Sequence, residues 1–134
     1  MEWGLRMDGK AMESALEETF TYSSKFQYVE IGVASGVTLS AVASFLKERR
    51  VRYHCDGVDI ANGWSFDVEG AVKSIRPYGL DVQLWDCGSF EYLRRFGKAT
   101  DFLLIDGCHC FECCFRDFVM AEPLIRVGGM VAFH

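Results

Sequence analysis

The fold of this chain is decided by residues 28–39, which read Tyr-Val-Glu-Ile-Gly-Val-Ala-Ser-Gly-Val-Thr-Leu. A short apolar run contains an acidic residue near its end, two glycines follow four positions apart, and an amphipathic helical pattern begins at once. This order indicates a strand, a tight turn and a helix N-terminus, the arrangement by which open α/β sheets hold nucleotide-like cofactors. Glycine suits such a turn because a Cβ would obstruct positive φ angles and close approach of a ligand.

The downstream sequence supplies the other parts of such a site. Residues 52–60 read as a second strand that reaches Asp59, roughly 20 residues beyond the glycine turn, where a carboxylate can accept hydrogen bonds from two ribose hydroxyls. Residues 101–106 form another apolar run that ends on a carboxylate, and residues 128–134 form a glycine turn followed by a strand. Apolar strands that alternate with helical segments predict a parallel sheet with helices on both faces.

Taken together, these segments resemble class I S-adenosylmethionine-dependent methyltransferases, and more narrowly their small-molecule O-methyltransferase-like branch. The resemblance covers roughly residues 26–134. It rests on residues 30–36 (Glu-x-Gly-x-Ala-x-Gly), Asp59, residues 105–112 (Ile-Asp-Gly-x-His-x-Phe-Glu) and residues 123–129 (Pro-Leu-Ile-Arg-Val-Gly-Gly).

The resemblance implies a Rossmann-like α/β fold: a doubly wound, mostly parallel sheet with strand order 3-2-1-4-5, without the usual C-terminal antiparallel strand pair. We expect one domain over residues 1–134, with an N-terminal helical segment (1–25) and a cofactor-binding core (26–134). Hydrophobic spacing and turn residues predict helices at residues 7–20, 37–48, 68–75, 89–96 and 111–122, and a third strand at 82–85. Ser89 is the expected N-cap of the fourth of these helices.

The implied cofactor is S-adenosyl-L-methionine. Its methionine part would meet the backbone of the glycine loop, and Glu30 would orient that loop or reach the cofactor's amino end. Asp59 would accept from the ribose, with a turn cap as the alternative role, and Ile60 would pack on the adenine. At the adenine edge, the side chain of Asp86 and the backbone of Cys87 or Gly88 are the candidates. The loop residues are Gly32, Val33, Ala34, Ser35 and Gly36.

The candidate catalytic residues are Asp106 and His109. Methyl transfer from a sulfonium mainly requires alignment of the two reactants, and a hydroxyl nucleophile also needs a base, for which histidine titrates in a useful range. The resemblance implies that Asp106 binds Mg²⁺ and that His109 acts as the base. The alternative is an Asp-Gly turn at a helix start with a partly exposed histidine.

Composition limits the other functional classes. Hydrophobic residues make up 50% of the chain and charged residues 25%, and the net charge of −5 argues against a nucleic-acid partner, which would require a clustered basic surface. No apolar run approaches the roughly 20 residues of a membrane span, and the N-terminus lacks a secretory pattern. We therefore expect a cytoplasmic protein away from membranes, and the resemblance implies that its acceptor is a small molecule.

The six cysteines leave two interpretations open. Cys108, Cys110, Cys113 and Cys114 crowd around His109, and two of them would share a helix face, which is compatible with thiolate binding of zinc. A structural zinc site usually shows two separated ligand pairs, however, so reduced cysteines that fill space are the simpler interpretation.

The C-terminal end of the sequence raises two further expectations. Related proteins continue past the fifth strand, so that strand is expected here to form a sheet edge through which copies of the chain could associate as a homo-oligomer. The same shortness leaves an alternative function open: a non-catalytic or truncated S-adenosylmethionine-binding module that acts as a partner subunit or fragment.

Overall fold

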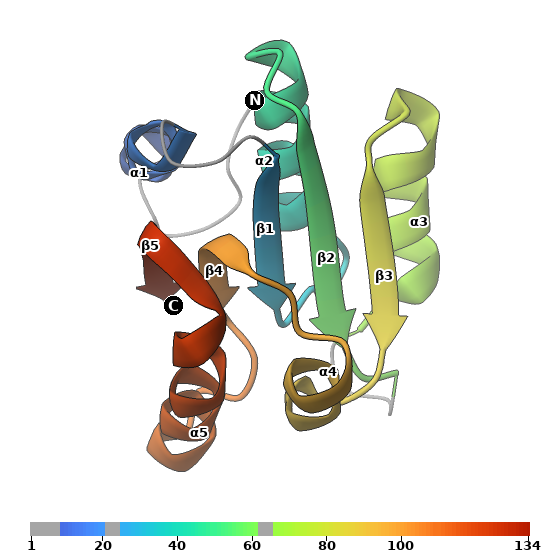
Figure 1. Ribbon diagram of the computed structural model, residues 1–134. Coiled ribbons are helices and arrows are strands. Elements are labelled where there is room, and N and C mark those ends of the chain that lie inside the picture. The colour runs from blue at the N-terminus through green and yellow to red at the C-terminus, as the bar shows by residue number, and fades with distance from the viewer. Residues whose placement is uncertain (1–8, 21–24, 62–65) are drawn as a thin grey trace.

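The computed structural model describes residues 9–20, 25–61 and 66–134, and its centre is a five-stranded sheet with the order β3-β2-β1-β4-β5. All four neighbouring pairs are parallel, so the predicted fold class and strand order are confirmed. Figure 1 shows β3 and β5 at the two edges of the sheet. The strands are β1 (Phe26–Ile31), β2 (Tyr53–Asp59), β3 (Val82–Asp86), β4 (Thr100–Ile105) and β5 (Ile125–Phe133).

Helices cover both faces of the sheet, as the alternation of strands and helical segments predicts. α1, α2 and α3 contribute to the hydrophobic core on one face, and α4 and α5 to the core on the other. None of the described helices is long and apolar enough to cross a membrane. The bounds are α1 (Gly9–Thr19), α2 (Val37–Glu48), α3 (Val68–Ile75), α4 (Ser89–Arg95) and α5 (Phe111–Ala121), with short 3-10 helices at Arg76–Tyr78 and Glu122–Leu124.

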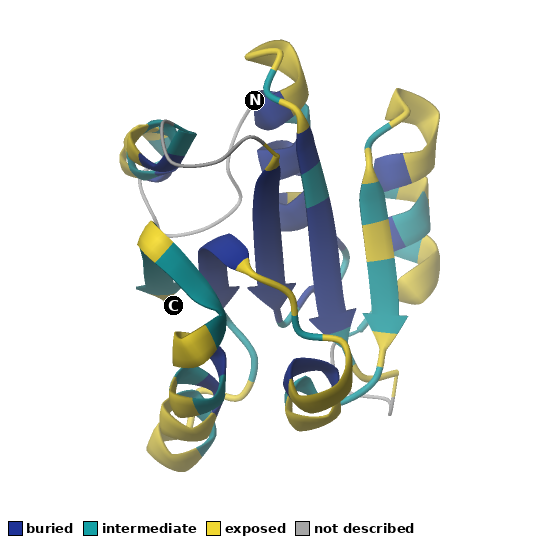
Figure 2. Cartoon of the chain, in the orientation of Figure 1, coloured by how far each residue is buried: buried dark blue, intermediate teal, exposed yellow. Residues whose placement is uncertain are grey.

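The central strands β1 and β4 are mainly apolar, with Gln27, Glu30, Thr100 and Asp101 as their polar members, and both of their faces are covered. Every residue of β1 and β4 is buried, and the burial map shows the middle of the sheet as its most enclosed part (Figure 2). Alternate β1 residues enter opposite cores: Tyr28 packs with α2, whereas Val29 and Ile31 pack with α4 and α5. This packing fixes the ends of β1, β2 and β4, where the acidic residues of the sequence lie.

The structure differs from the sequence-based expectations at Ser89 and at the start of β5. Ser89 is not an N-cap, because Gly88 takes that position and the Ser89 hydroxyl instead donates to Asp117 on α5. β5 begins at Ile125 rather than Gly128 and forms an edge of the sheet, with Val127 almost fully exposed, but association through this edge stays a prediction. Parts of the N-terminal segment (1–8 and 21–24), and residues 62–65 of the loop after β2, lie outside the described residues.

Gly32 is the point of closest approach between the β1–α2 loop and the end of β4. Its φ is +91°, and a Cβ built on it would lie 2.0 Å from the backbone oxygen of Asp106. A side chain there would separate the two strand ends that form one wall of the site. The glycine at this position is therefore required by backbone packing.

Gly32→Ala should lower the free energy of unfolding by about 2–3 kcal/mol, because it combines a disfavoured φ with overpacking against immobile backbone. Urea denaturation of both proteins would measure the loss. Gly88→Ala is the matched control: its φ is −67°, and a Cβ there would meet no described atom within 4 Å. A loss of no more than about 1 kcal/mol is expected for this control, because Gly88 is the N-cap of α4 and alanine is a weaker N-cap than glycine. Equal losses in the two variants would contradict the packing role of Gly32.

Candidate functional site

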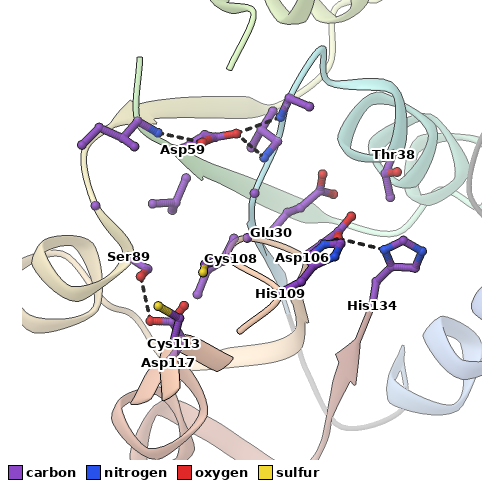
Figure 3. Close-up of a pocket in the computed structure, with 18 of the residues that line it drawn as sticks. Glu30, Thr38, Asp59, Ser89, Asp106, Cys108, His109, Cys113, Asp117 and His134 are labelled. Atoms are coloured by element: carbon purple, nitrogen blue, oxygen red, sulfur yellow. Dashed lines mark hydrogen bonds and ion pairs between the residues drawn. The ribbon is translucent and has the colours of Figure 1, made fainter. Parts of the chain in front are cut away.

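A cleft of about 1170 Å³ opens at the carboxyl ends of β1, β2 and β4. It lies where the chain order of the strands reverses, between β1 and β4, which is where open α/β sheets place their ligands. Four of the five glycine-loop residues line it (Gly32, Val33, Ala34 and Ser35), together with Glu30, Asp59, Ile60, Cys87, Asp106 and His109. Figure 3 shows Asp59 on one side of the cleft, with Asp106 and two histidines gathered on another.

Asp59 holds the glycine loop in shape. Its Oδ2 accepts hydrogen bonds from the backbone N–H groups of Val33 and Ala34, both at 2.9 Å, and its Oδ1 accepts from the N–H of Ile60 at 2.8 Å. A carboxylate offers about four acceptor positions, so three are already used. The remaining position, on Oδ1, can accept one hydroxyl without any change in the loop, whereas a second hydroxyl requires one N–H group to give way.

Glu30 is a carboxyl group buried in the floor of the cleft. It is 1% exposed, and the Tyr28 hydroxyl donates to its Oε2 at 2.8 Å. Burial raises the pKa of Glu30 to about 8; the Tyr28 hydrogen bond opposes this shift, while the Asp106 and Asp59 carboxylates add to it. Because folding raises this pKa, the contribution of Glu30 to stability is full below about pH 4.5 and is lost as the pH rises through about 8. A cation placed beside it would favour the ionised form.

The N-terminus of α2 faces the cleft and is open to an anion. Gly36 is its N-cap, with a φ of 77°, and no described side chain caps the first turn. Val37 and Thr38 of that turn line the cleft. Free N–H groups and the helix dipole favour a carboxylate or phosphate at such a position.

Ala34 also adopts a positive φ, at 49°, a backbone conformation that glycine takes more readily than alanine. Its backbone N–H is one of the two that Asp59 holds, so the carboxylate supports a loop conformation that alanine disfavours.

Asp106 is hydrogen-bonded to two histidines. Its Oδ1 lies 3.1 Å from His109 Nε2 and 2.8 Å from His134 Nδ1, and the two rings meet edge to face. Each imidazole therefore has one nitrogen on the carboxylate and a second available for proton transfer. The predicted pair Asp106 and His109 is thus brought together, and His134 joins it because β5 runs parallel to β4 and ends beside it.

Asp106, His109 and His134 could together hold a metal ion, since their ligand atoms lie within 4.8 Å of one another. One carboxylate and two imidazoles do not fit Mg²⁺, which prefers an octahedral set of oxygen ligands. Imidazole suits zinc, copper, iron or nickel instead. The donor set of the described residues thus gives no support to the expectation that Asp106 binds Mg²⁺.

Gly36 and Asp86 are the two predicted site residues that do not line the cleft. Gly36 is the N-cap of α2, and Asp86 is the last residue of β3. The Oδ1 atom of Asp86 accepts a hydrogen bond from the backbone N–H of Ala61 at 2.8 Å, and so it ties the end of β3 to the loop after β2. Cys87 and Gly88 do line the cleft, as does Phe90, a partly exposed ring that the sequence analysis did not single out.

Sequence reasoning also missed the contact between α4 and α5 at the cleft. The Ser89 hydroxyl donates to Asp117 at 2.7 Å, and the Arg116 guanidinium lies 3.4 Å from the same Asp117 oxygen. Asp117 is 3% exposed although its helix is amphipathic. Only the packing of two helices separated in sequence reveals this pair, whereas His134 could have been found from its place at a strand end next to β4.

Comparison with known proteins gives a family and a fold. Residues 29–134 match the family described as Methyltransferase domain, and a search of curated proteins gave no match. Three solved structures are similar at low identity. The O-methyltransferase NovP has a TM-score of 0.78 and 18% identity, with 92% of this chain and 62% of that chain covered. A caffeoyl-CoA O-methyltransferase-like protein from Staphylococcus aureus has a TM-score of 0.72 and 16% identity, with 92% of this chain and 55% of that chain covered.

The third is a methyltransferase from Podospora anserina solved with S-adenosylhomocysteine, with a TM-score of 0.65, 13% identity, and 93% and 52% of the two chains covered. At these identities the likeness concerns the fold. This chain spans little more than half the length of the three proteins.

Proposed function

The chain belongs to the methyltransferase domain family, and we propose that it binds S-adenosyl-L-methionine in the cleft and transfers the methyl group to a hydroxyl of a small molecule. The observation that carries this proposal is the set of complementary groups along one cleft: an open helix N-terminus, a buried carboxyl group and a strand-end aspartate. S-adenosyl-L-methionine carries a carboxylate, an ammonium and ribose hydroxyls, one kind of group for each of the three.

The charges of the cofactor match the order of these groups. Its carboxylate would lie at the N-terminus of α2, and its ammonium would approach Glu30. One ribose hydroxyl would donate to the free position on Asp59. The adenine would lie between Ile60 and the Cys87–Gly88 backbone, beside Phe90, all of which line the same cleft.

The proposed reaction is an in-line displacement. The acceptor oxygen attacks the methyl carbon, the carbon–sulfur bond breaks, and the sulfur leaves as the neutral thioether of S-adenosylhomocysteine. The acceptor's proton passes to an imidazole nitrogen of His109, with Asp106 holding the other nitrogen. His134 has the same relation to Asp106 and is the second candidate base.

Calorimetric titration with S-adenosylmethionine and S-adenosylhomocysteine is the test of binding, followed by an acceptor screen that detects S-adenosylhomocysteine release. Micromolar binding and turnover of a hydroxyl compound are expected. Folded protein that binds neither compound would refute the proposal, and binding without transfer to any acceptor would reduce it to a binding module.

With an acceptor in hand, replacing the base should lower kcat by about 10²–10⁴-fold while cofactor affinity is retained. His109→Gln and His134→Gln, assayed side by side, would assign the role. If kcat fell by less than about tenfold in both variants, neither histidine would be the base.

Glu30 should make cofactor affinity dependent on pH. Since its pKa is about 8 before binding and the cofactor's ammonium favours the carboxylate, binding releases a proton and strengthens as the pH rises. Affinity should fall by more than about tenfold between pH 7.5 and pH 6. Calorimetry at several pH values would measure this, and Glu30→Gln should give a flat profile. A flat profile in the unaltered protein would contradict the contact.

A further inference from the structure

Three cysteine thiols meet at the start of α5, beside the cleft. The Sγ atoms of Cys108 and Cys110 lie 3.2 Å apart, and those of Cys108, Cys110 and Cys113 all lie within 4.8 Å of one another. A tetrahedral zinc ion with Zn–S bonds of about 2.3 Å requires sulfur atoms roughly 3.8 Å apart, so the observed spacing needs only small side-chain rotations. The fourth clustered cysteine, Cys114, is outside this group, because its Sγ is hydrogen-bonded to the carbonyl oxygen of Cys108.

We propose that Cys108, Cys110 and Cys113 form a binding site for a thiophilic cation, Zn²⁺ in the first instance, with a fourth coordination position open to water. Thiolate sulfur selects zinc and copper(I) over magnesium and calcium. Cys108 and Cys110 are exposed and Cys113 is half-buried, so an ion can enter without rearrangement of the core.

The local backbone favours a thiolate at Cys110. Cys110 is the N-cap of α5, and its Sγ accepts a hydrogen bond from the backbone N–H of Cys113 at 3.4 Å. Partial positive charge at a helix N-terminus stabilises a thiolate.

An ion here would connect two parts of the candidate site. Cys108 lies in the loop that carries Asp106 and His109, Cys113 lies in the first turn of α5, and both line the cleft. Figure 3 shows Cys108 and Cys113 on the side of the cleft opposite Asp59. Coordination by all three thiolates would fix this loop against the helix. The inference does not depend on methyl transfer, because it concerns a metal bound to the cleft wall.

The test is titration of the reduced protein, with all six thiols free, using Cd²⁺ and then Zn²⁺. Cadmium bound by thiolates gives a charge-transfer absorption in the ultraviolet, and Zn²⁺ should displace it. We expect one thiolate-bound cadmium ion per chain, counted by this absorption, to which the imidazoles of His109 and His134 do not contribute. Cys110→Ser should weaken binding by more than about 100-fold, since even loss of a group that only supports a ligand costs 10–100-fold. Serine is a favoured N-cap, so α5 should stay folded in this variant, which circular dichroism would check.

Cys114→Ser is the matched control. It removes a neighbouring thiol on the same helix and retains a hydroxyl that can donate to the Cys108 carbonyl oxygen. The affinity for Cd²⁺ should therefore change by less than about threefold, much less than the loss expected when a ligand is removed. Two results would overturn the proposal: no charge-transfer band in the reduced unaltered protein, or equal affinities in the unaltered protein and Cys110→Ser.

Discussion

Asp59→Ala should weaken the binding of S-adenosylmethionine by more than about 100-fold. Each hydrogen bond to a charged group contributes about 1.5–3 kcal/mol. The variant would lose the acceptor for the ribose and also the three backbone N–H contacts that shape the glycine loop. Calorimetric titration of folded variant protein would measure the loss.

Asp86→Ala is the control for this prediction. Asp86 also ends a strand and also accepts from a loop N–H group, but it does not line the cleft. Its replacement should change affinity by less than about threefold, a fraction of one hydrogen bond. If Asp59→Ala bound the cofactor normally, or if both variants lost affinity equally, the assignment of Asp59 would be wrong.

Asp56→Ala should have the largest effect on stability, a loss of about 3–5 kcal/mol in the free energy of unfolding. Asp56 is fully buried in β2, and its carboxylate accepts from Gln27, Trp85, Tyr92 and Lys98. Without it, these donors would be left without their acceptor in or near the core, where an unsatisfied polar group is costly.

The titration of Asp56 gives an independent check. Burial alone would raise its pKa, but the hydrogen bonds from Trp85, Lys98 and Tyr92 outweigh burial and lower it. A lowered folded-state pKa means that this stabilisation is present above about pH 3.8 and is lost as the pH falls further.

Urea denaturation at neutral pH would measure the loss, with Asp81→Ala as the control. The Asp81 side chain is 54% exposed and is hydrogen-bonded to His54, so its removal should cost no more than about 1 kcal/mol. A similarly small loss for Asp56→Ala would show that the network does not hold this part of the fold together.

How far the sequence alone reached is clearest at the strand ends. Hydrophobic periodicity located the five strands and the helices that connect them, and the glycines of residues 32–36 located the turn. The order of these elements was enough to place the site, because parallel strands joined by helices have their carboxyl ends at the same edge of the sheet. Glu30, Asp59 and Asp106 follow from that rule, since each lies at or next to the end of an apolar run.

Only the tertiary structure decided which partners these side chains use. Asp59 binds loop N–H groups, Asp86 turns away from the cleft, and His134 meets Asp106. Each outcome depends on side-chain direction and on neighbours distant in sequence, which the register of β4 and β5 and the packing of α5 set. Periodicity specifies which face of an element is buried; it does not specify the atom that a strand-end carboxylate will meet, because that contact is made between segments that the local sequence does not relate.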